Sequence, residues 1–237
     1  MMKYLRVPLV LSVAAIGISA YSPINDTVNR LLFLGGVIGI WLALVLLVWR
    51  HRLGRRGLFA VPFIVVVIVM LPGRASQKAL HQAYVQRLKG YAETPYVWGG
   101  ENKRGIDCSG LPRRALQEAL LWQGLRQFDG SCVREAVVQW WQDASARDLG
   151  TGLRDLTVSL GIRGKIRDLK TIDLWPGDFA VTADGVHLVV YLGDEQWIQA
   201  DPSAMKVISQ DGRTAENPWF SRTVTLHRWR LLGQRLD

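Results

Sequence analysis

Long apolar stretches dominate the first third of the chain. Residues 7–25 and residues 31–49 each contain 19 consecutive uncharged positions, and a shorter apolar stretch follows at residues 57–73. A helix of 19 residues is about 28 Å long, close to the ~30 Å thickness of the hydrocarbon core of a bilayer. We therefore expect a membrane region at residues 1–73 with three transmembrane helices. Because two basic residues precede the first stretch, a cleaved signal peptide is the alternative interpretation of that stretch.

Beyond the membrane region the pattern changes from helical to strand-like. Apolar residues recur at helical spacing in three segments, at residues 75–89, 111–124 and 133–147. The first of these predicted helices is a juxtamembrane linker within residues 74–90. After Trp175, β-rich runs bounded by turn residues predict strands at residues 179–182, 187–192, 196–200 and 223–231. Helices followed by strands indicate an α+β fold, here in one domain at residues 91–237.

The basic residues of the membrane region predict its orientation. The chain has 29 Lys and Arg against 20 Asp and Glu, and residues 1–72 contain seven of these basic residues but only one acid, Asp26. The link between the second and third predicted spans is the most basic part, with Arg50, Arg52, Arg55 and Arg56. By the positive-inside rule this link is cytoplasmic, so the C-terminal domain is expected outside the bacterial cytoplasmic (inner) membrane, whether or not the first segment is cleaved. Positive charge that lies beside apolar spans indicates that the chain has a lipid bilayer as its partner and does not bind nucleic acid.

Two cysteines, Cys108 and Cys132, limit the covalent and metal chemistry of the chain. They are too few for a disulfide framework or for a zinc site made of thiolates, and we expect no metal and no organic cofactor. Cys108 lies between a turn with Gly99, Gly100 and Gly105 and a predicted helix, where unpaired backbone N–H groups favour a thiolate and can hold an oxyanion. Cys108 is therefore a candidate nucleophile, with a small buried apolar residue as the alternative. Cys132 has no such turn and is expected to be a small buried apolar residue.

A thiol nucleophile needs an imidazole with which to exchange protons. The chain beyond the membrane region offers His81, His187 and His227. His81 lies in the juxtamembrane helix, and His227 is expected on the surface of a strand. His187 opens the most β-rich run directly after a tight turn, at a sheet edge where a pocket can form. His187 is therefore the predicted general base.

A third polar group must orient this imidazole, and the register of the following hairpin limits the choice. If residues 193–195 form a three-residue loop, His187 pairs with Asp201. Gln199 then lies on the same face of the sheet as His187, as its diagonal neighbour. A two-residue loop would shift the register by one residue and place Gln199 on the opposite face. Gln199 is the favoured partner of the imidazole and Asp201 is the alternative.

Four short motifs occur in the order in which a known family carries them. They are Tyr96-Val97-Trp98-Gly99-Gly100, Asp107-Cys108-Ser109-Gly110-Leu111, Pro176-Gly177-Asp178-Phe179, and the run from His187 to Gly193 with Gln199 twelve residues after the histidine. In these motifs the chain resembles the NlpC/p60 family of papain-like cell-wall cysteine peptidases, over roughly residues 88–200. The resemblance implies a papain-like core in which N-terminal helices pack on an antiparallel β-sheet.

The resemblance also implies roles for individual residues. Cys108 would be the nucleophile, His187 the general base and acid, and Gln199 the third polar residue. The residues that would line the substrate site are Tyr96, Asp107 and Ser109. Family members commonly hydrolyse amide bonds in peptidoglycan stem peptides, typically between D-glutamyl and diamino-acid residues, so peptidoglycan stem peptides are the implied partner.

The sequence departs from the family pattern in two places. The third polar residue is most often histidine in the family, and Gln199 stabilises an imidazolium less than a carboxylate would. The interval between the cysteine and the histidine is long, with an apparent insertion at residues 126–170. Its basic residues suggest either a ledge for an acidic polymer or lipid head group or a solvated basic face: Arg154, Arg163, Lys165, Arg167 and Lys170.

Motifs and topology together predict a membrane-anchored cell-wall cysteine hydrolase of the multi-pass type. Two other functions are compatible with the sequence. The same cysteine and histidine could transfer an acyl or amide group to a lipid or protein, since a fold does not dictate the acceptor. Alternatively, the domain could bind wall peptides or a partner membrane protein without catalysis.

Overall fold

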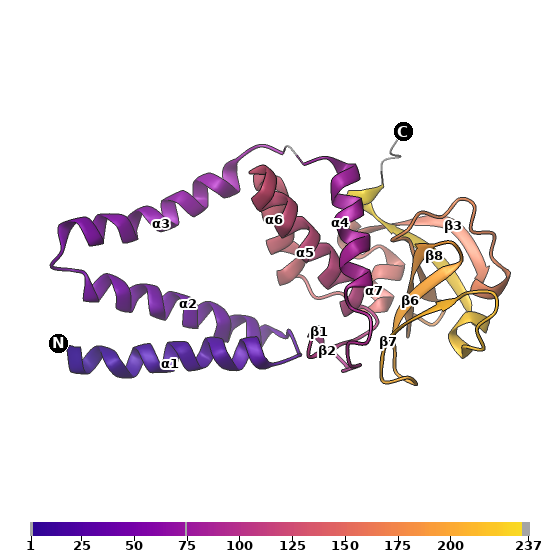
Figure 1. Ribbon diagram of the computed structural model, residues 1–237, viewed down its shortest axis with the longest axis horizontal. Coiled ribbons are helices and arrows are strands. Elements are labelled where there is room, and N and C mark those ends of the chain that lie inside the picture. Colours follow the sequence, from indigo (N-terminus) through magenta and orange to yellow (C-terminus); the bar gives the residue numbers. More distant parts are fainter. Residues whose placement is uncertain (1, 74, 234–237) are drawn as a thin grey trace.

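The computed structural model describes residues 2–73 and 75–233, in which three long helices extend away from a domain of helices and β-sheet (Figure 1). The three helices are α1 (Met2–Tyr21), α2 (Thr27–Leu47) and α3 (Arg52–Met70). α1 and α2 pack closely because α2 presents glycines to its neighbour: a side chain at Gly36 would come within 2.6 Å of Ile16, and one at Gly39 would collide with Ser12.

Among the described residues, two helices are long and apolar enough to cross a membrane, α2 with a mean hydropathy of 2.3 and α3 with 2.0. The apolar part of α1, from Arg6 to Tyr21, is shorter. The expectation of three such helices is corrected to two by this measure. Within the described residues, α2 and α3 are thus the candidate membrane-spanning helices.

Four α-helices belong to the described part of the domain and lie on one side of its sheet (Figure 1). They are α4 (Gln77–Lys89), α5 (Gly110–Gln127), α6 (Gly130–Trp141) and α7 (Ala146–Thr151). The first two match the predicted helices closely. The third predicted helix is divided, because Ser145 and Asp148 form a capping box that begins α7 after an extended break at Gln142.

α4 is more than a link between the membrane region and the domain. Its residues Tyr84 and Leu88 are fully buried in the core that the helices share with the sheet. The hydroxyl oxygen of Tyr84 accepts a hydrogen bond from Trp229 Nε1 at 2.9 Å, across the whole length of the domain sequence. The helix expected as a linker is therefore an integral part of the hydrophobic core.

Six antiparallel strands form the main sheet in the order β3-β8-β4-β5-β6-β7, which confirms the predicted α+β fold. The strands are β3 (Thr157–Lys165), β4 (Phe179–Thr182), β5 (Leu188–Gly193), β6 (Gln196–Asp201), β7 (Lys206–Asp211) and β8 (Thr223–Trp229). A separate small hairpin consists of β1 (Glu101–Asn102) and β2 (Gly105–Ile106). Short 3-10 helices complete the described elements: η1 (Leu153–Asp155), η2 (Ile166–Asp168), η3 (Pro218–Ser221) and η4 (Arg230–Leu232).

The segment expected as an insertion, residues 126–170, builds part of this domain. It supplies α6, α7 and the edge strand β3, which pairs with β8 from Thr157 opposite Trp229 to Lys165 opposite Thr223. The five basic side chains that the sequence analysis singled out in it are exposed to solvent, as in the solvated-face interpretation: Arg154, Arg163, Lys165, Arg167 and Lys170.

The β5–β6 hairpin differs from the prediction at its turn but not further along the strands. Gly193 pairs with Gln196, so the loop has two residues, Asp194 and Glu195, both with positive φ. An irregularity between Tyr191 and Gly193 adds one residue to β5 and restores the register of a three-residue loop, with Val190 opposite Ile198. Gln199 therefore lies on the face of the sheet that a three-residue loop would give it.

Candidate active site

The carboxylate of Asp107 fixes the turn that carries the cysteine. Its Oδ1 accepts hydrogen bonds from Ser109 Oγ (3.0 Å) and Gly110 N (2.6 Å), and its Oδ2 accepts one from Gly99 N (2.9 Å). Gly110 must be glycine, because a Cβ there would collide with the carbonyl oxygen of Gly100. Asp107 and Ser109, expected in the substrate site, border the cleft and at the same time tie the glycine-rich turn to the start of α5.

Cys108 lies directly before α5 and is 7% exposed. Its thiol is 3.9 Å from the carbonyl oxygen of Val186, to which it donates, and the backbone N–H of Leu188 also faces it. The sulfur thus contacts the backbone on both sides of His187. Burial, with the negative charge of Asp107, raises the pKa of the Cys108 thiol to about 12, although N–H groups oppose the rise. The expectation that Cys108 prefers the thiolate form is therefore wrong for this resting structure. Burial raises the pKa of the thiol by more than the N–H groups at the start of α5 lower it.

His187 begins a hydrogen-bonded chain of four buried polar side chains. Its Nε2 is 2.7 Å from Gln199 Oε1, Gln199 Nε2 donates to Asp201 Oδ2 (3.3 Å), and Asn217 Nδ2 donates to the same oxygen (2.8 Å). A carboxylate can only accept, so the amide nitrogen of Gln199 faces Asp201 and its oxygen faces the imidazole. The neutral imidazole then carries its proton on Nε2, which leaves Nδ1 as the basic nitrogen. Gln199 contacts the imidazole, and Asp201, the alternative partner, contacts Gln199.

The ring of His187 is also held by packing. Trp219 stacks on it with 4.0 Å between ring centroids and 22° between planes, and the guanidinium of Arg222 lies 4.7 Å from the centre of the Trp219 ring. The backbone N–H of His187 donates to Thr182 Oγ1 at 3.0 Å. Burial lowers the pKa of His187, against the opposing effects of Gln199 and Asp201. Sequence reasoning missed Trp219, in η3, and Asn217, which caps η3, and no spacing in the sequence relates these two residues to the histidine.

The remaining sequence candidates occupy different environments. Tyr96 is partly buried near the cysteine, and burial together with the charges of Cys108 and Asp107 raises its pKa to about 12. His81 Nε2 is 2.6 Å from the carbonyl oxygen of Pro176, on the α4 side of the domain. His227 was expected on the surface but is only 4% exposed, because β8 lies between β3 and β4 inside the sheet. Within residues 2–73 and 75–233, no group of three His, Cys, Asp or Glu side chains is arranged to hold a metal ion.

A cleft of about 630 Å³ opens beside Cys108. One wall is the cysteine turn with Trp98, and a second is α7 with Arg147. A third wall comes from the loop between α1 and α2, at residues 24–26. The cleft is lined by Cys108, and His187 is the residue between the two backbone groups that face the thiol. A thiol and an imidazole are the two groups that covalent acyl transfer uses.

Comparison with known proteins decides the family. The sequence model of the NlpC/P60 family matches residues 93–228, more than half of the chain. The protein is a member of the NlpC/P60 family. Each predicted site residue lies within the NlpC/P60 region, as do α6, α7 and β3, whereas α1 to α3 lie outside it.

Individual relatives of the NlpC/P60 domain are distant. Dipeptidyl-peptidase 6 of Lysinibacillus sphaericus is 34% identical over 68 residues, which is 28% of this chain and 25% of that protein. The chain therefore matches about a quarter of the length of this curated relative. Among solved structures, the peptidoglycan hydrolase RipB of Mycobacterium tuberculosis is 21% identical, with 67% of this chain and 69% of that chain covered and a TM-score of 0.38. An NlpC/P60 family protein of Bacillus cereus is 18% identical, with 64% and 40% covered and a TM-score of 0.40.

Proposed function

We propose that this protein hydrolyses an amide bond in peptidoglycan stem peptides, with Cys108 as nucleophile and His187 as general base and acid. The observation that carries the proposal is the hydrogen-bonded chain His187–Gln199–Asp201 beside a thiol at the start of α5, inside an NlpC/P60 domain. Stem peptides are the substrate that family membership favours. The proposed substrate-lining residues are Asp107 and Ser109, which border the cleft, and Tyr96, which is partly buried near the cysteine.

The proposed reaction proceeds through an acyl-enzyme. Nδ1 of His187 accepts the thiol proton as the sulfur of Cys108 attacks the carbonyl carbon of the amide. Backbone N–H groups at the start of α5 stabilise the oxyanion of the tetrahedral intermediate. The imidazolium then gives its proton to the leaving amine as the C–N bond breaks. A water molecule, deprotonated by Nδ1, cleaves the thioester and restores the thiol.

The experiment that tests this function uses the full-length protein in detergent and purified peptidoglycan fragments. Mass spectrometry should detect two new fragments whose masses together equal that of the substrate plus one water, and their identity names the cleaved bond. Fragments that stay intact with a correctly folded protein would overturn the hydrolase proposal. Transfer of the acyl half to a lipid or a protein without added water would select the transferase alternative.

The protonation states of the pair predict how activity depends on pH. With the pKa of Cys108 raised to about 12 and that of His187 lowered, the resting pair is a thiol and a neutral imidazole at neutral pH. Protonation of His187 abolishes its function as a base, so activity should fall only as the pH drops below about 6.5, the ordinary pKa of histidine. A profile of kcat/KM against pH checks this, and an acid limb centred above pH 7 would contradict it.

Gln199 is proposed to hold His187 in the tautomer with the proton on Nε2. Gln199→Ala should lower kcat by about 10²-fold. This loss is smaller than the one in a serine protease whose catalytic histidine is held in the wrong tautomer, because alanine leaves both tautomers of His187 accessible. Gln199→His keeps an acceptor for Nε2–H and a donor toward Asp201, so it should restore most of the activity. Steady-state kinetics on both variants check this, and an alanine variant as active as the parent would exclude the role.

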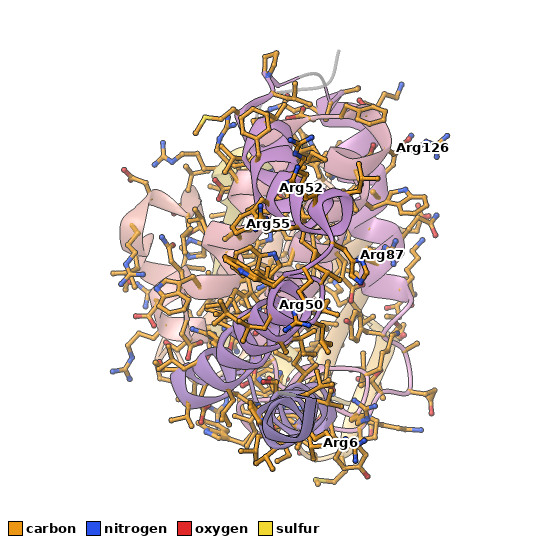
Figure 2. All side chains as sticks on the ribbon, turned by 90° about the vertical axis from the view of Figure 1, so that its left-hand side faces the viewer. Arg6, Arg50, Arg52, Arg55, Arg87 and Arg126 are labelled. Atoms are coloured by element: carbon orange, nitrogen blue, oxygen red, sulfur yellow. The ribbon has the colours of Figure 1, made fainter. Side chains whose placement is uncertain are left out.

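We also propose that α2 and α3 cross the cytoplasmic membrane and anchor the domain, with residues 1–73 as membrane region and 74–90 as the connection. Figure 2 looks at the end of the three helices that lies far from the domain, where Arg6, Arg50, Arg52 and Arg55 are labelled. Because this end of the helices is basic, the positive-inside rule favours a cytoplasmic position for it. The catalytic domain at residues 91–237, at the opposite end of the helices, is then extracytoplasmic. Alkaline phosphatase fused to the C-terminus should then be active, and an inactive but stable fusion would contradict this orientation.

A further inference from the structure

The loop between α1 and α2 is docked onto the glycine-rich turn near Cys108. Ile24 forms an isolated antiparallel bridge with Gly100. The backbone N–H of Glu101 donates to Pro23 O at 2.8 Å, and Asn102 Nδ2 donates to Ser22 O at 2.6 Å. The loop thus continues the small β1–β2 hairpin by backbone pairing.

A buried polar junction accompanies this backbone pairing. Arg30, on α2, is only 4% exposed, and its guanidinium donates to the carbonyl oxygens of Trp141 (2.7 Å) and Asn25 (2.6 Å). Glu101, also buried, pairs with Arg113 at 3.0 Å and accepts a hydrogen bond from Asn25. Buried charges are costly unless they are paired, and here the partners of Arg30 come from both the loop and the domain. The junction is therefore a specific contact and not an incidental one.

The docked loop borders the same cleft as the cysteine. Ile24, Asn25 and Asp26 line it together with Cys108 and Arg147. Asp26 is already engaged as the cap of α2, where its carboxylate accepts from Asn29 N at 2.8 Å. Ile24 keeps 42% of its surface exposed, which leaves an apolar side chain available to a ligand in the cleft.

We propose that the α1–α2 loop is a substrate-binding wall of the Cys108 cleft, with Ile24 as its contact residue. The inference rests on the proposed function and adds that the NlpC/P60 domain alone has an incomplete substrate site. A stem peptide binds between the domain and the loop, at the point where the first two N-terminal helices meet. The spans then define the substrate site in addition to anchoring the domain.

The test compares Ile24→Ala and Ile24→Trp with the same substitutions at Ile172 in the full-length protein. Ile172 is 88% exposed and lies outside the cleft, so it is the matched control. Both Ile24 variants should raise KM for soluble stem peptides by about 10-fold with kcat nearly unchanged, because alanine removes apolar contact and tryptophan fills the cleft. Equal KM values for the Ile24 variants, the Ile172 variants and the parent would overturn the proposal.

Binding of uncleaved stem peptide in the Cys108→Ala background separates this inference from the proposed function. Ile24→Ala in that background should weaken Kd by a similar factor, while Ile172→Ala should not. A parent protein that binds but does not cleave would contradict hydrolysis and leave the loop as a binding wall. Binding that is unchanged by both Ile24 variants would contradict the wall even if the protein is an active hydrolase. Thermal unfolding of each variant identifies any that have lost the fold. Ile24→Ala makes the side chain smaller and Ile24→Trp makes it larger, so the two variants test the wall independently.

Discussion

Replacing Cys108 by alanine should lower kcat/KM on stem peptides by at least about 10⁴-fold, because loss of the nucleophile removes the covalent pathway altogether. The residual rate would come only from binding and from the N–H groups at the start of α5. The fold should survive the change, since the hydrogen bond that the thiol donates, to Val186 O, is long at 3.9 Å. Steady-state kinetics with the full-length protein measures the loss.

Cys132→Ala is the matched control for this prediction. Cys132 has the same 7% exposure as Cys108 but lies in the first turn of α6, away from the residues that line the cleft. Its replacement should leave kcat/KM close to the parent value. If the two alanine variants were equally active, the assignment of the nucleophile would be wrong. A loss of activity in both would indicate a structural effect, which comparison of their thermal unfolding identifies.

Asp178→Ala should lower the free energy of unfolding by about 3–5 kcal/mol, the usual effect of breaking a buried ion pair from one side. Asp178 is 1% exposed and forms a bidentate pair with Arg228, at 2.6 and 2.7 Å. Its Oδ2 also accepts from Trp175 N at 2.8 Å. The guanidinium of Arg228 lies 3.5 Å from the centre of the Trp175 ring. Without the carboxylate, a largely buried cation and a backbone N–H lose their partner.

Denaturant unfolding of the full-length protein, followed by tryptophan fluorescence, measures this change. Asp184→Ala is the control, since Asp184 pairs with Arg222 at 3.0 Å but both side chains are half exposed. Exposed pairs contribute about 0–1 kcal/mol, so the control should shift the unfolding midpoint little. Equal shifts for the two variants would show that the buried pair does not stabilise the sheet. The aspartate of the Pro-Gly-Asp motif would then need another explanation.

The turn chemistry around Cys108 and the helices before the sheet were predictable because they depend on local sequence. Gly110, Asp107 and the helix that follows form a local unit, in which the close approach of Gly100 excludes any side chain at position 110. The β5–β6 register was predictable for a different reason. The irregularity near Leu192 compensates for the two-residue turn, so an incorrect loop length still gave the correct face for Gln199.

The remaining differences arise from long-range contacts. β3 was missed because its side chains alternate between partial burial and exposure at a sheet edge, with Gly161 and Gly164 inside it. His227 was wrongly expected on the surface, whereas its strand β8 lies inside the sheet between β3 and β4. The thiol of Cys108 was expected to be acidic because the helix start is local, whereas the burial that raises its pKa depends on β5. Docking of the α1–α2 loop joins residues about 75 positions apart, Ile24 and Gly100, which no sequence period reveals.

The measurement that tests the central claim most directly is covalent labelling by a stem-peptide analogue that carries an alkylating group at the position of the scissile carbonyl. Peptide mapping of the labelled full-length protein should find one adduct, on Cys108, and excess unmodified stem peptide should slow its formation. His187→Ala should reduce the labelling rate, because the thiol then lacks its base. A label on Cys132, or labelling of Cys108 that stem peptide does not slow, would contradict the account.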